Sequence, residues 1–492
     1  MEEQLWQACS DGKIEEVQEF LENLQIDINW QDSEYSRTPF YRACFGHVEI
    51  VKLLLNDERV DFNKADKYGL TPFMIACYNG HIEIARLLLN VERVDINKAS
   101  NDGWTSFMIA CYNGHLEVVK LLLNDKRMDI NQATNDGWTS FMIACHYGNI
   151  EIVKILLNDN RIDIDQVTND GLTPFHRACL LGRIEDVKLL LNDERVNVNE
   201  ENKISCTSFY IACGFGYIDV VKLLLEDERV DINKADNEDW TPFFIACLEG
   251  HIEVVKLLLN DERVDLNKAR NSGETPFYIA CRNGHIAIVK LLLNDNRVDI
   301  NRGLNIGYSP FYVACLNGHI EVVKLLLNNS RVDINKARDD GLTPFYLVCE
   351  KQHFGLVKLL LNDNRVDINK AQNQGTTPFY IACQNGRIEI VRLLLNDNRI
   401  DINQANKNEA TPFYIACQNG HTEIVKLLLN DERIEINKAR DGGFTPFWIA
   451  CQNGQIEIVK LLFMIQELMS IKQKIMVQHH FILLVNVDTL KL

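Results

Sequence analysis

Cysteine and histidine are the residues of this chain that can act as nucleophiles, redox groups or metal ligands, so their spacing is the first question. Apart from Cys206, the cysteines follow one register, which is 34 residues at every step from Cys77 to Cys451. Histidines share the period and stand four residues after the cysteine in several units, at His81, His115, His251, His285, His319 and His421. A residue that recurs once per unit serves the architecture of the unit. We therefore expect structural roles here rather than catalysis or metal binding.

The register cysteines are expected to be buried, free thiols. Packed helices lie roughly 8–10 Å apart, whereas the Cα atoms of a disulfide lie within about 7 Å of each other. Zinc ligands need a still closer approach, at roughly 2.0–2.3 Å from the metal. Many unpaired thiols favour a reducing, cytoplasmic compartment. Cys206 is a candidate reactive thiol if it lies exposed, and an inert packing contact is the alternative.

The rest of the composition excludes several classes of protein. The chain has 492 residues with 51 Lys+Arg against 69 Asp+Glu, a formal net charge of −18, which argues against a nucleic-acid surface. No apolar run approaches the roughly 20 residues of a membrane span. We expect no signal peptide, because the first residues are acidic and no apolar stretch follows them that could serve as one. No phosphate-binding loop, nucleophile elbow or metal-binding helix motif is present. We expect no enzyme activity, no cofactor, no metal and a monomer.

The elements that carry these residues are short helices in pairs. In the unit around Cys77, Thr71 is a good N-cap and Pro72 suits the first helical turn. Gly80 can adopt the left-handed conformation that ends a helix. A second helix is expected to begin near Ile82, with apolar residues at helical spacing on one face. Two helices of about eight residues cannot bury their own apolar faces, so neighbouring units must stack.

This unit resembles the ankyrin repeat. The residues that carry the resemblance are Thr-Pro-Phe-Tyr-Ile-Ala-Cys, then Asn-Gly-His, Val-Val-Lys-Leu-Leu-Leu and Val-Asp-Ile-Asn. The resemblance implies an all-α solenoid of helix–turn–helix units with β-turn hairpins, consisting of an N-terminal capping unit at 1–34 and thirteen repeats at 35–463. The histidine of the family motif is mostly Tyr or Met here and survives as His176.

In this family the hairpins and first helices form a concave groove that binds proteins, and the most variable positions of this chain fall there. They stand before the threonine or after the cysteine of each unit. The candidates are Leu70, Tyr78, Trp104, Tyr112, Trp138, His146, Tyr147, Leu172, Leu180, Leu181, Phe215 and Trp240. Exposed aromatic clusters suggest a binding site, while packing of the rings between neighbouring hairpins is the alternative interpretation.

The predicted function is a non-enzymatic scaffold that binds a protein or peptide partner through this groove. The alternative is that the chain is the ankyrin portion of a larger enzyme, channel or regulatory protein that is truncated at its C-terminus.

The tail at 464–492 breaks the repeat. Its residues are compatible with codons that, read one frame away, give LLFNDSRVDVNKAKNNG, one ambiguous residue and TPFHIACQCGHIEV, a fifteenth unit in register. We expect that a single-base deletion has converted this repeat into out-of-frame peptide. An amphipathic capping or membrane-contacting helix is the alternative.

Overall fold

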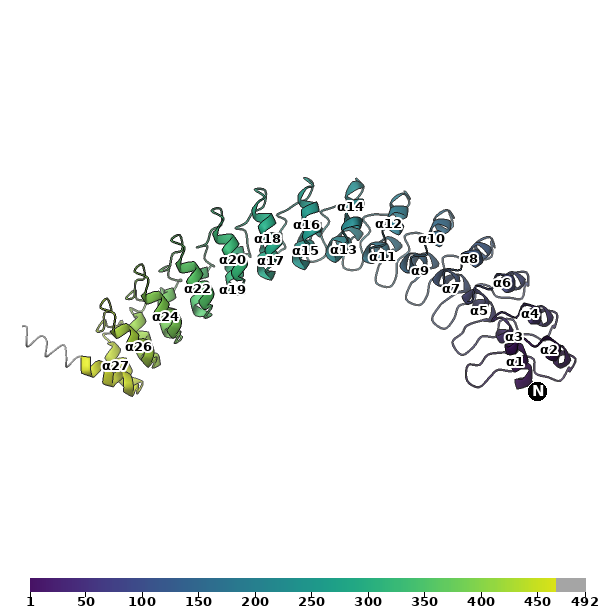
Figure 1. The fold of residues 1–492 in the computed structure, drawn as a ribbon, viewed down its shortest axis with the longest axis horizontal. Coiled ribbons are helices and arrows are strands. Elements are labelled where there is room, and N and C mark those ends of the chain that lie inside the picture. Colours follow the sequence, from purple (N-terminus) through teal and green to yellow (C-terminus); the bar gives the residue numbers. More distant parts are fainter. Residues whose placement is uncertain (466–492) are drawn as a thin grey trace, which may run out of the picture. The chain divides into compact units, whose positions relative to one another are not determined.

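The computed structural model describes residues 1–465 and divides the chain into two compact units, Met1–Asp265 and Leu266–Leu492. Both units consist of paired short helices joined by loops (Figure 1). The tail expected at 464–492, with its frameshift interpretation, lies outside the described residues except for its first two positions. The boundaries of the capping unit and of the thirteen repeats stay predictions.

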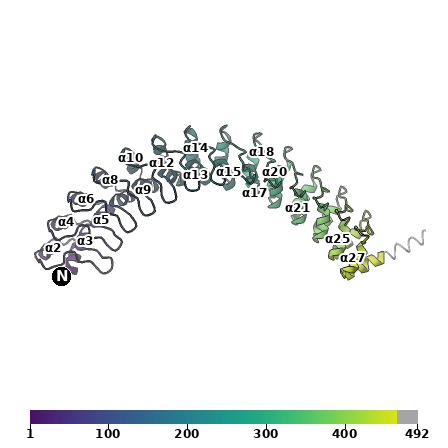
Figure 2. The same ribbon diagram turned by 180° about the vertical axis from the view of Figure 1, so that it is seen from behind.

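In the first unit the helices form two parallel rows (Figures 1 and 2). The first helix of each pair belongs to one row: α1 (Glu2–Asp11), α3 (Pro39–Ala43), α5 (Pro72–Tyr78), α7 (Ser106–Tyr112), α9 (Ser140–Tyr147), α11 (Pro174–Leu180), α13 (Ser208–Phe215) and α15 (Pro242–Glu249). The second helices form the other row: α2 (Ile14–Leu21), α4 (Val48–Leu55), α6 (Ile82–Leu89), α8 (Leu116–Leu123), α10 (Ile150–Leu157), α12 (Ile184–Leu191), α14 (Ile218–Glu226) and α16 (Ile252–Leu259). Within this unit the rows curve gently, and the first helices with their long loops lie on the inner side.

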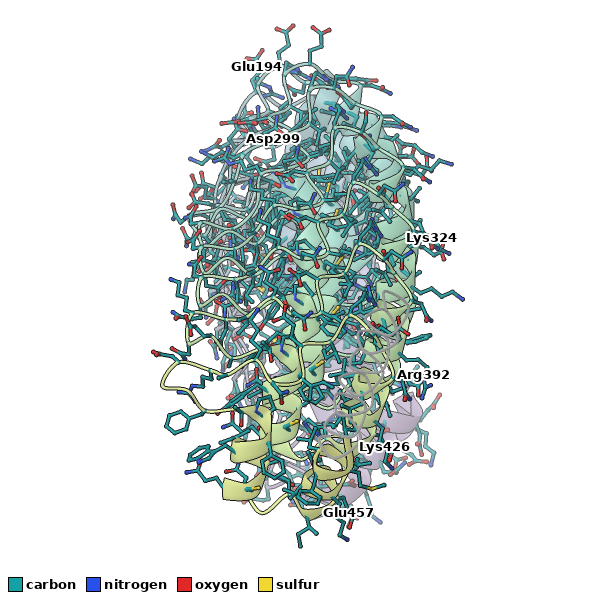
Figure 3. The ribbon with its side chains drawn as sticks, turned by 90° about the vertical axis from the view of Figure 1, so that its left-hand side faces the viewer. Glu194, Asp299, Lys324, Arg392, Lys426 and Glu457 are labelled. Atoms are coloured by element: carbon teal, nitrogen blue, oxygen red, sulfur yellow. The ribbon has the colours of Figure 1, made fainter. Side chains whose placement is uncertain are left out.

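The second unit repeats the arrangement. Its first helices are α17 (Pro276–Asn283), α19 (Pro310–Leu316), α21 (Pro344–Glu350), α23 (Pro378–Gln384), α25 (Pro412–Asn419) and α27 (Pro446–Gln452). Its second helices are α18 (Ile286–Leu293), α20 (Ile320–Leu327), α22 (Phe354–Leu361), α24 (Ile388–Leu395) and α26 (Thr422–Leu429), and a further helical segment covers 456–465. Lys324, Arg392 and Lys426, on α20, α24 and α26, extend away from the ribbon (Figure 3).

The helix pair forms as its sequence predicts. The Thr71 hydroxyl accepts a hydrogen bond from the Met74 amide at 3.2 Å, and Pro72 occupies the first turn of α5, where no amide is needed. Gly80 follows with φ 73°, the left-handed geometry that lets α6 begin at Ile82. In the unit of α21 and α22, Lys351-Gln352-His353 stands where other units have Asn-Gly-His. Gln352 adopts the left-handed conformation with φ 65°, so both helices of this unit still form.

The core of each unit lies between its two rows and between successive repeats. Phe73, Ala76, Cys77 and Leu88 are buried, and their equivalents recur along the chain. Stacking neighbours therefore complete each core, as a repeat array requires. All fifteen cysteines are free thiols, and all are buried except Cys451.

Asparagine side chains tie the hairpins of successive repeats together. The Asn97 side-chain amide donates to the Arg127 carbonyl oxygen at 2.7 Å, and its oxygen accepts from the Asp129 amide at 2.8 Å. The same pair of bonds recurs at Asn131, to Arg161 and Asp163. These side-chain hydrogen bonds connect the hairpins in place of a β-sheet. Within residues 1–465 the β pairing consists of two isolated bridges, Ala133 with Thr139 and Arg440 with Phe444.

Histidines of the turn link each first helix to the repeat before it. Nε2 of His115 lies 2.8 Å from the Tyr78 carbonyl oxygen, and Nε2 of His251 lies 2.8 Å from that of Gly214. The expected structural role is thus confirmed for these histidines, and the bond goes to the end of the preceding first helix.

Candidate functional site

Five side chains on the inner row of the first unit form a continuous chain of ring contacts. Trp104 packs edge-on against Tyr112 with centroids 5.6 Å apart, and Tyr112 meets Tyr147 of the next repeat at 4.5 Å. The chain continues from Tyr147 to His146 at 4.9 Å and from His146 to Trp138 at 5.0 Å. We call these five residues the aromatic ladder. T-shaped pairs of this kind are favourable beyond the area they bury.

The position of the ladder follows from helix geometry. Trp104 and Trp138 stand just before the N-cap threonines of α7 and α9, while Tyr112, His146 and Tyr147 occupy the last turns of the same helices. The contacts of Trp104 with Tyr112 and of Trp138 with His146 show that the side chains at the two ends of each helix meet on the same side of the stack.

The ladder borders a pocket of about 380 Å³. Trp104, Trp138, His146 and Tyr147 line it together with Ile143, and the carboxylate-bearing Asp102 and Asp136 belong to its wall. Aromatic walls with a few polar groups are typical of sites that hold a ligand or a partner's side chain. The pocket is therefore a defined cavity on a surface otherwise built from regular repeats.

Positive charges lie close to Trp138 and His146, whereas the acidic residues Asp102 and Asp136 belong to the pocket wall. The Arg177 guanidinium of α11 lies over the Trp138 ring, 4.3 Å from its centroid, a cation–π contact. Burial and then the positive charges of Arg177 and Arg183 hold the pKa of His146 below its ordinary value. The imidazole is therefore neutral at pH 7. Its Nδ1 is buried and has no hydrogen-bond partner.

The other predicted groove residues lie on the same row but outside this cluster. Phe215 stacks on Tyr217 at 6.0 Å and Trp240 stacks on Phe244 at 5.7 Å, contacts that do not join the ladder. The leucines and Tyr78 do not line the ladder pocket; Tyr78, Leu181 and Phe215 are exposed, and the half-buried ones are Leu70, Leu172 and Leu180. Structure thus brings together five of the twelve candidates.

The interpretation of Cys206 as an exposed reactive thiol is wrong. Its side chain is 4% exposed, and burial raises the pKa of the thiol to about 12. The residue packs at the hairpin instead, where its carbonyl oxygen lies 3.2 Å from Nε2 of the buried His176. A neutral thiol at physiological pH is a poor nucleophile.

Most hairpin arginines pair with the aspartate two residues before them and not with the one two residues later. Arg127 binds Asp125, with 2.6 Å between Nη2 and Oδ2, and the same Nη2 donates to the Leu89 carbonyl oxygen of the preceding repeat at 2.7 Å. Asp129 serves the asparagine bonds between hairpins instead. The arginine side chain reaches backward because that carbonyl group ends the preceding second helix.

Two residues that matter here were not singled out from the sequence. Arg177 stands where the corresponding positions, such as Ile109, Ile143 and Ile211, carry an aliphatic residue. Asp186 likewise interrupts a column of buried aliphatic residues, between Ile152 and Val220. A polar residue in an otherwise apolar column is the signal that identifies both.

Two kinds of site are missing from the part of the chain that the structure describes. Residues 1–465 contain no group of three or more His, Cys, Asp or Glu side chains placed to hold a metal ion. No described helix has the length and apolar character needed to cross a membrane.

The fold defines a solenoid of helix–turn–helix repeats, and comparison with known families identifies the class. The model for ankyrin repeats, built on three copies of the unit, matches residues 2–66, 58–134, 127–202, 194–270, 262–338, 311–406 and 398–473. These matches overlap and cover nearly the whole sequence, so the chain belongs to the ankyrin repeat family. Ankyrin repeats are generally protein–protein interaction modules and are typically non-enzymatic. No curated protein matches the chain.

Proposed function

We propose that this chain is a non-enzymatic scaffold that binds a segment of a protein partner across the aromatic ladder. The observation that carries the proposal is the pocket of about 380 Å³ that Trp104, Trp138, His146 and Tyr147 line. Tyr112 and Tyr147 expose 39% and 47% of their surface, which is unusual for large rings in contact with each other. Tryptophan and tyrosine are the residues that most often dominate binding energy at interfaces.

The geometry is compatible with rings that pack between neighbouring repeats and also bind a partner. Trp104 and Trp138 are half-buried and pack within the stack, so their orientation is established before any partner arrives. A rigid surface loses little conformational entropy on binding. Asp102 and Asp136 beside the pocket, together with the net charge of −18, favour a partner segment that carries basic residues.

Alanine substitution of the two tryptophans tests the proposal. A partner is first isolated by affinity capture and mass spectrometry, and its purified segment is titrated against the full chain. Trp104→Ala and Trp138→Ala are each expected to weaken binding at least tenfold, because each removes a large ring that lines the ladder pocket. Circular dichroism and thermal melting establish that the variants remain folded.

Trp240→Ala is the matched control. Trp240 occupies the same position of its own repeat but stacks on Phe244 outside the ladder. It should leave the affinity within about twofold of the unmodified chain. Equal affinities for all three variants, or a loss confined to Trp240→Ala, would exclude the ladder as the binding surface.

A further inference from the structure

The third position of the second helices carries a buried aliphatic residue in all repeats but two, the exceptions being the exposed Glu16 of α2 and Asp186 of α12. At the third residue of the helix, twelve repeats carry a buried aliphatic residue: Ile50, Ile84, Val118, Ile152, Val220, Val254, Ile288, Val322, Leu356, Ile390, Ile424 and Ile458. The repeat of α12 has Asp186 at this position. Its side chain is as buried as those of its neighbours, since Asp186 exposes only 2% of its surface.

The Asp186 carboxylate is left without a direct partner. Its Oδ1 is buried and accepts no hydrogen bond, and Asp186 forms no ion pair within residues 1–465. The positive charge of Arg183, the residue just before α12, lowers the pKa of this carboxyl, but the Arg183 Nη2 donates to the His146 carbonyl oxygen at 3.1 Å. From α9, the Cys145 thiol also faces the carboxylate and is neutral, because burial raises its pKa well above the ordinary value.

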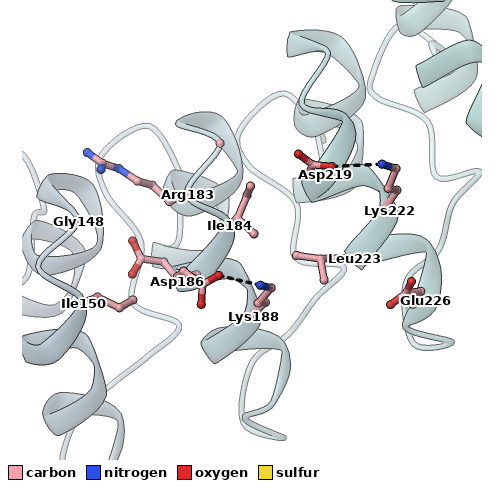
Figure 4. Close-up of a pocket in the computed structure, with 12 residues that line it drawn as sticks. Gly148, Ile150, Arg183, Ile184, Asp186, Lys188, Asp219, Lys222, Leu223 and Glu226 are labelled. Carbon is pink, nitrogen blue, oxygen red and sulfur yellow. Dashed lines mark hydrogen bonds and ion pairs between the residues drawn. The ribbon is translucent and has the colours of Figure 1, made fainter. Parts of the chain in front are cut away.

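Asp186 belongs to the lining of a pocket of about 800 Å³ on the second-helix row of α10, α12 and α14 (Figure 4). Its apolar surface comes from Ile150, Ile184 and Leu223, one from each helix. The pocket lies on the row opposite the aromatic ladder. It is therefore a separate feature of the first unit.

The other acidic groups of the pocket are mostly neutralised by their own helices. Glu185 pairs with Lys188 at 2.7 Å. Asp219 pairs with Lys222 at 3.2 Å (Figure 4). Glu226 lies exposed at the far end, on α14. Asp186 is thus the one buried carboxylate among the lining residues, and a cation entering the pocket does not have to displace an existing partner from it.

Stability alone does not account for an aspartate at this position. A buried carboxylate without a hydrogen bond or ion pair is costly, whereas Val or Ile at the same position stabilises the neighbouring repeats. Polar groups that reduce stability are typical of functional sites. The cost disappears when a positively charged donor binds the carboxylate.

We propose that this pocket binds a lysine or arginine side chain of a protein partner, with the aliphatic stem on Ile150, Ile184 and Leu223 and the cation at Asp186. Long basic side chains suit such a site because they combine an apolar stem with a charged end. This inference assigns a second interaction site, on the row opposite the ladder, and does not depend on the function proposed for the ladder.

The test uses the full chain and a small probe, Nα-acetyl-lysine N-methylamide, observed by saturation-transfer NMR at millimolar concentration. The neutral norleucine analogue, which keeps the stem and lacks the ammonium, is the matched probe. We expect transfer to the lysine probe to be at least fivefold stronger than to the norleucine probe. Asp186→Val and Asp186→Asn should abolish this difference.

Two control variants separate the pocket from other acidic surface. Glu185→Gln removes a carboxylate that is already paired with Lys188, and Glu117→Gln removes the equivalent carboxylate of α8, which is paired with Lys120 outside the pocket. Both should bind the lysine probe as the unmodified chain does. No transfer to the unmodified chain, equal transfer to both probes, or undiminished transfer to folded Asp186→Val would overturn the proposal.

Discussion

Individual residues that depart from their column give this chain its distinctive chemistry. Arg177 and Asp186 replace aliphatic residues within one helix pair, α11 and α12, and each brings a charge into surroundings that are apolar elsewhere. The Arg177 guanidinium makes a cation–π contact with the Trp138 ring, whereas the buried Oδ1 of Asp186 has no hydrogen-bond partner. The two substitutions therefore have different consequences for stability.

The stability of the chain should depend on pH through Asp186. Burial raises the pKa of this carboxyl to about 6, while Arg183 lowers it and Glu185 raises it by smaller amounts. Since the folded state holds the proton to higher pH than the unfolded state, the protonated site favours folding at acidic pH. That contribution is lost as the pH rises from about 4 through 6.

Asp186→Val isolates this contribution, because valine does not titrate. The variant should be more stable than the unmodified chain at pH 7.5, and its advantage should shrink by on the order of 2 kcal/mol at pH 4.5. Pairs such as Arg127 with Asp125, which keep the pKa of Asp125 low and weaken in acid, are common to both proteins and cancel. Urea denaturation at the two pH values measures the difference, and an advantage that is the same at both would contradict it.

The hairpins show how one missing amide weakens a repeated element. Asp165 stands where the neighbouring repeats have Asn131 and Asn199, and it lacks the NH₂ group that those residues donate to a carbonyl oxygen of the next hairpin. Its Oδ2 accepts a long bond of 3.4 Å from the Asn197 amide, and Oδ1 has no partner. Burial accordingly raises the pKa of Asp165.

Asp165→Asn is expected to stabilise the chain by about 1 kcal/mol, the usual net value of one hydrogen bond. The new NH₂ group would reach the Arg195 carbonyl oxygen, as Asn131 reaches that of Arg161. The reverse change, Asn131→Asp, should destabilise by a similar amount, and the denaturation midpoints of both variants measure the effects. Unchanged midpoints in both would show that the side-chain bonds between hairpins contribute little.

Across the whole molecule, each described repeat is covered by its neighbours, and this determines which thiols can react. Fourteen of the fifteen cysteines are buried in the stack, while Cys451 of α27 is exposed. A buried thiol stays protonated and is shielded from reagents. Burial raises the pKa of Cys9, on α1 of the first unit, to about 12.

One thiol per native chain should therefore react rapidly with a disulfide reagent such as DTNB, and fifteen should react in denaturant. Cys451→Ala should remove the rapid phase without changing the remaining thiols. Rapid modification of several thiols in that variant would mean that the repeats open locally far more often than their packing implies.

The repeat, its helix pairs and the family could be predicted from the amino-acid sequence, because N-caps, prolines and helical apolar spacing are local signals repeated many times. The sequence also located the row that carries Trp104 and Trp138. Tertiary structure alone decided that five of the twelve candidates meet, that Cys206 is buried and that Arg127 binds Asp125, since these depend on distances between repeats. The same holds for the carboxylate of Asp186: a break in a column is visible in the sequence, but only packing shows whether a charge is exposed, paired or left without a partner.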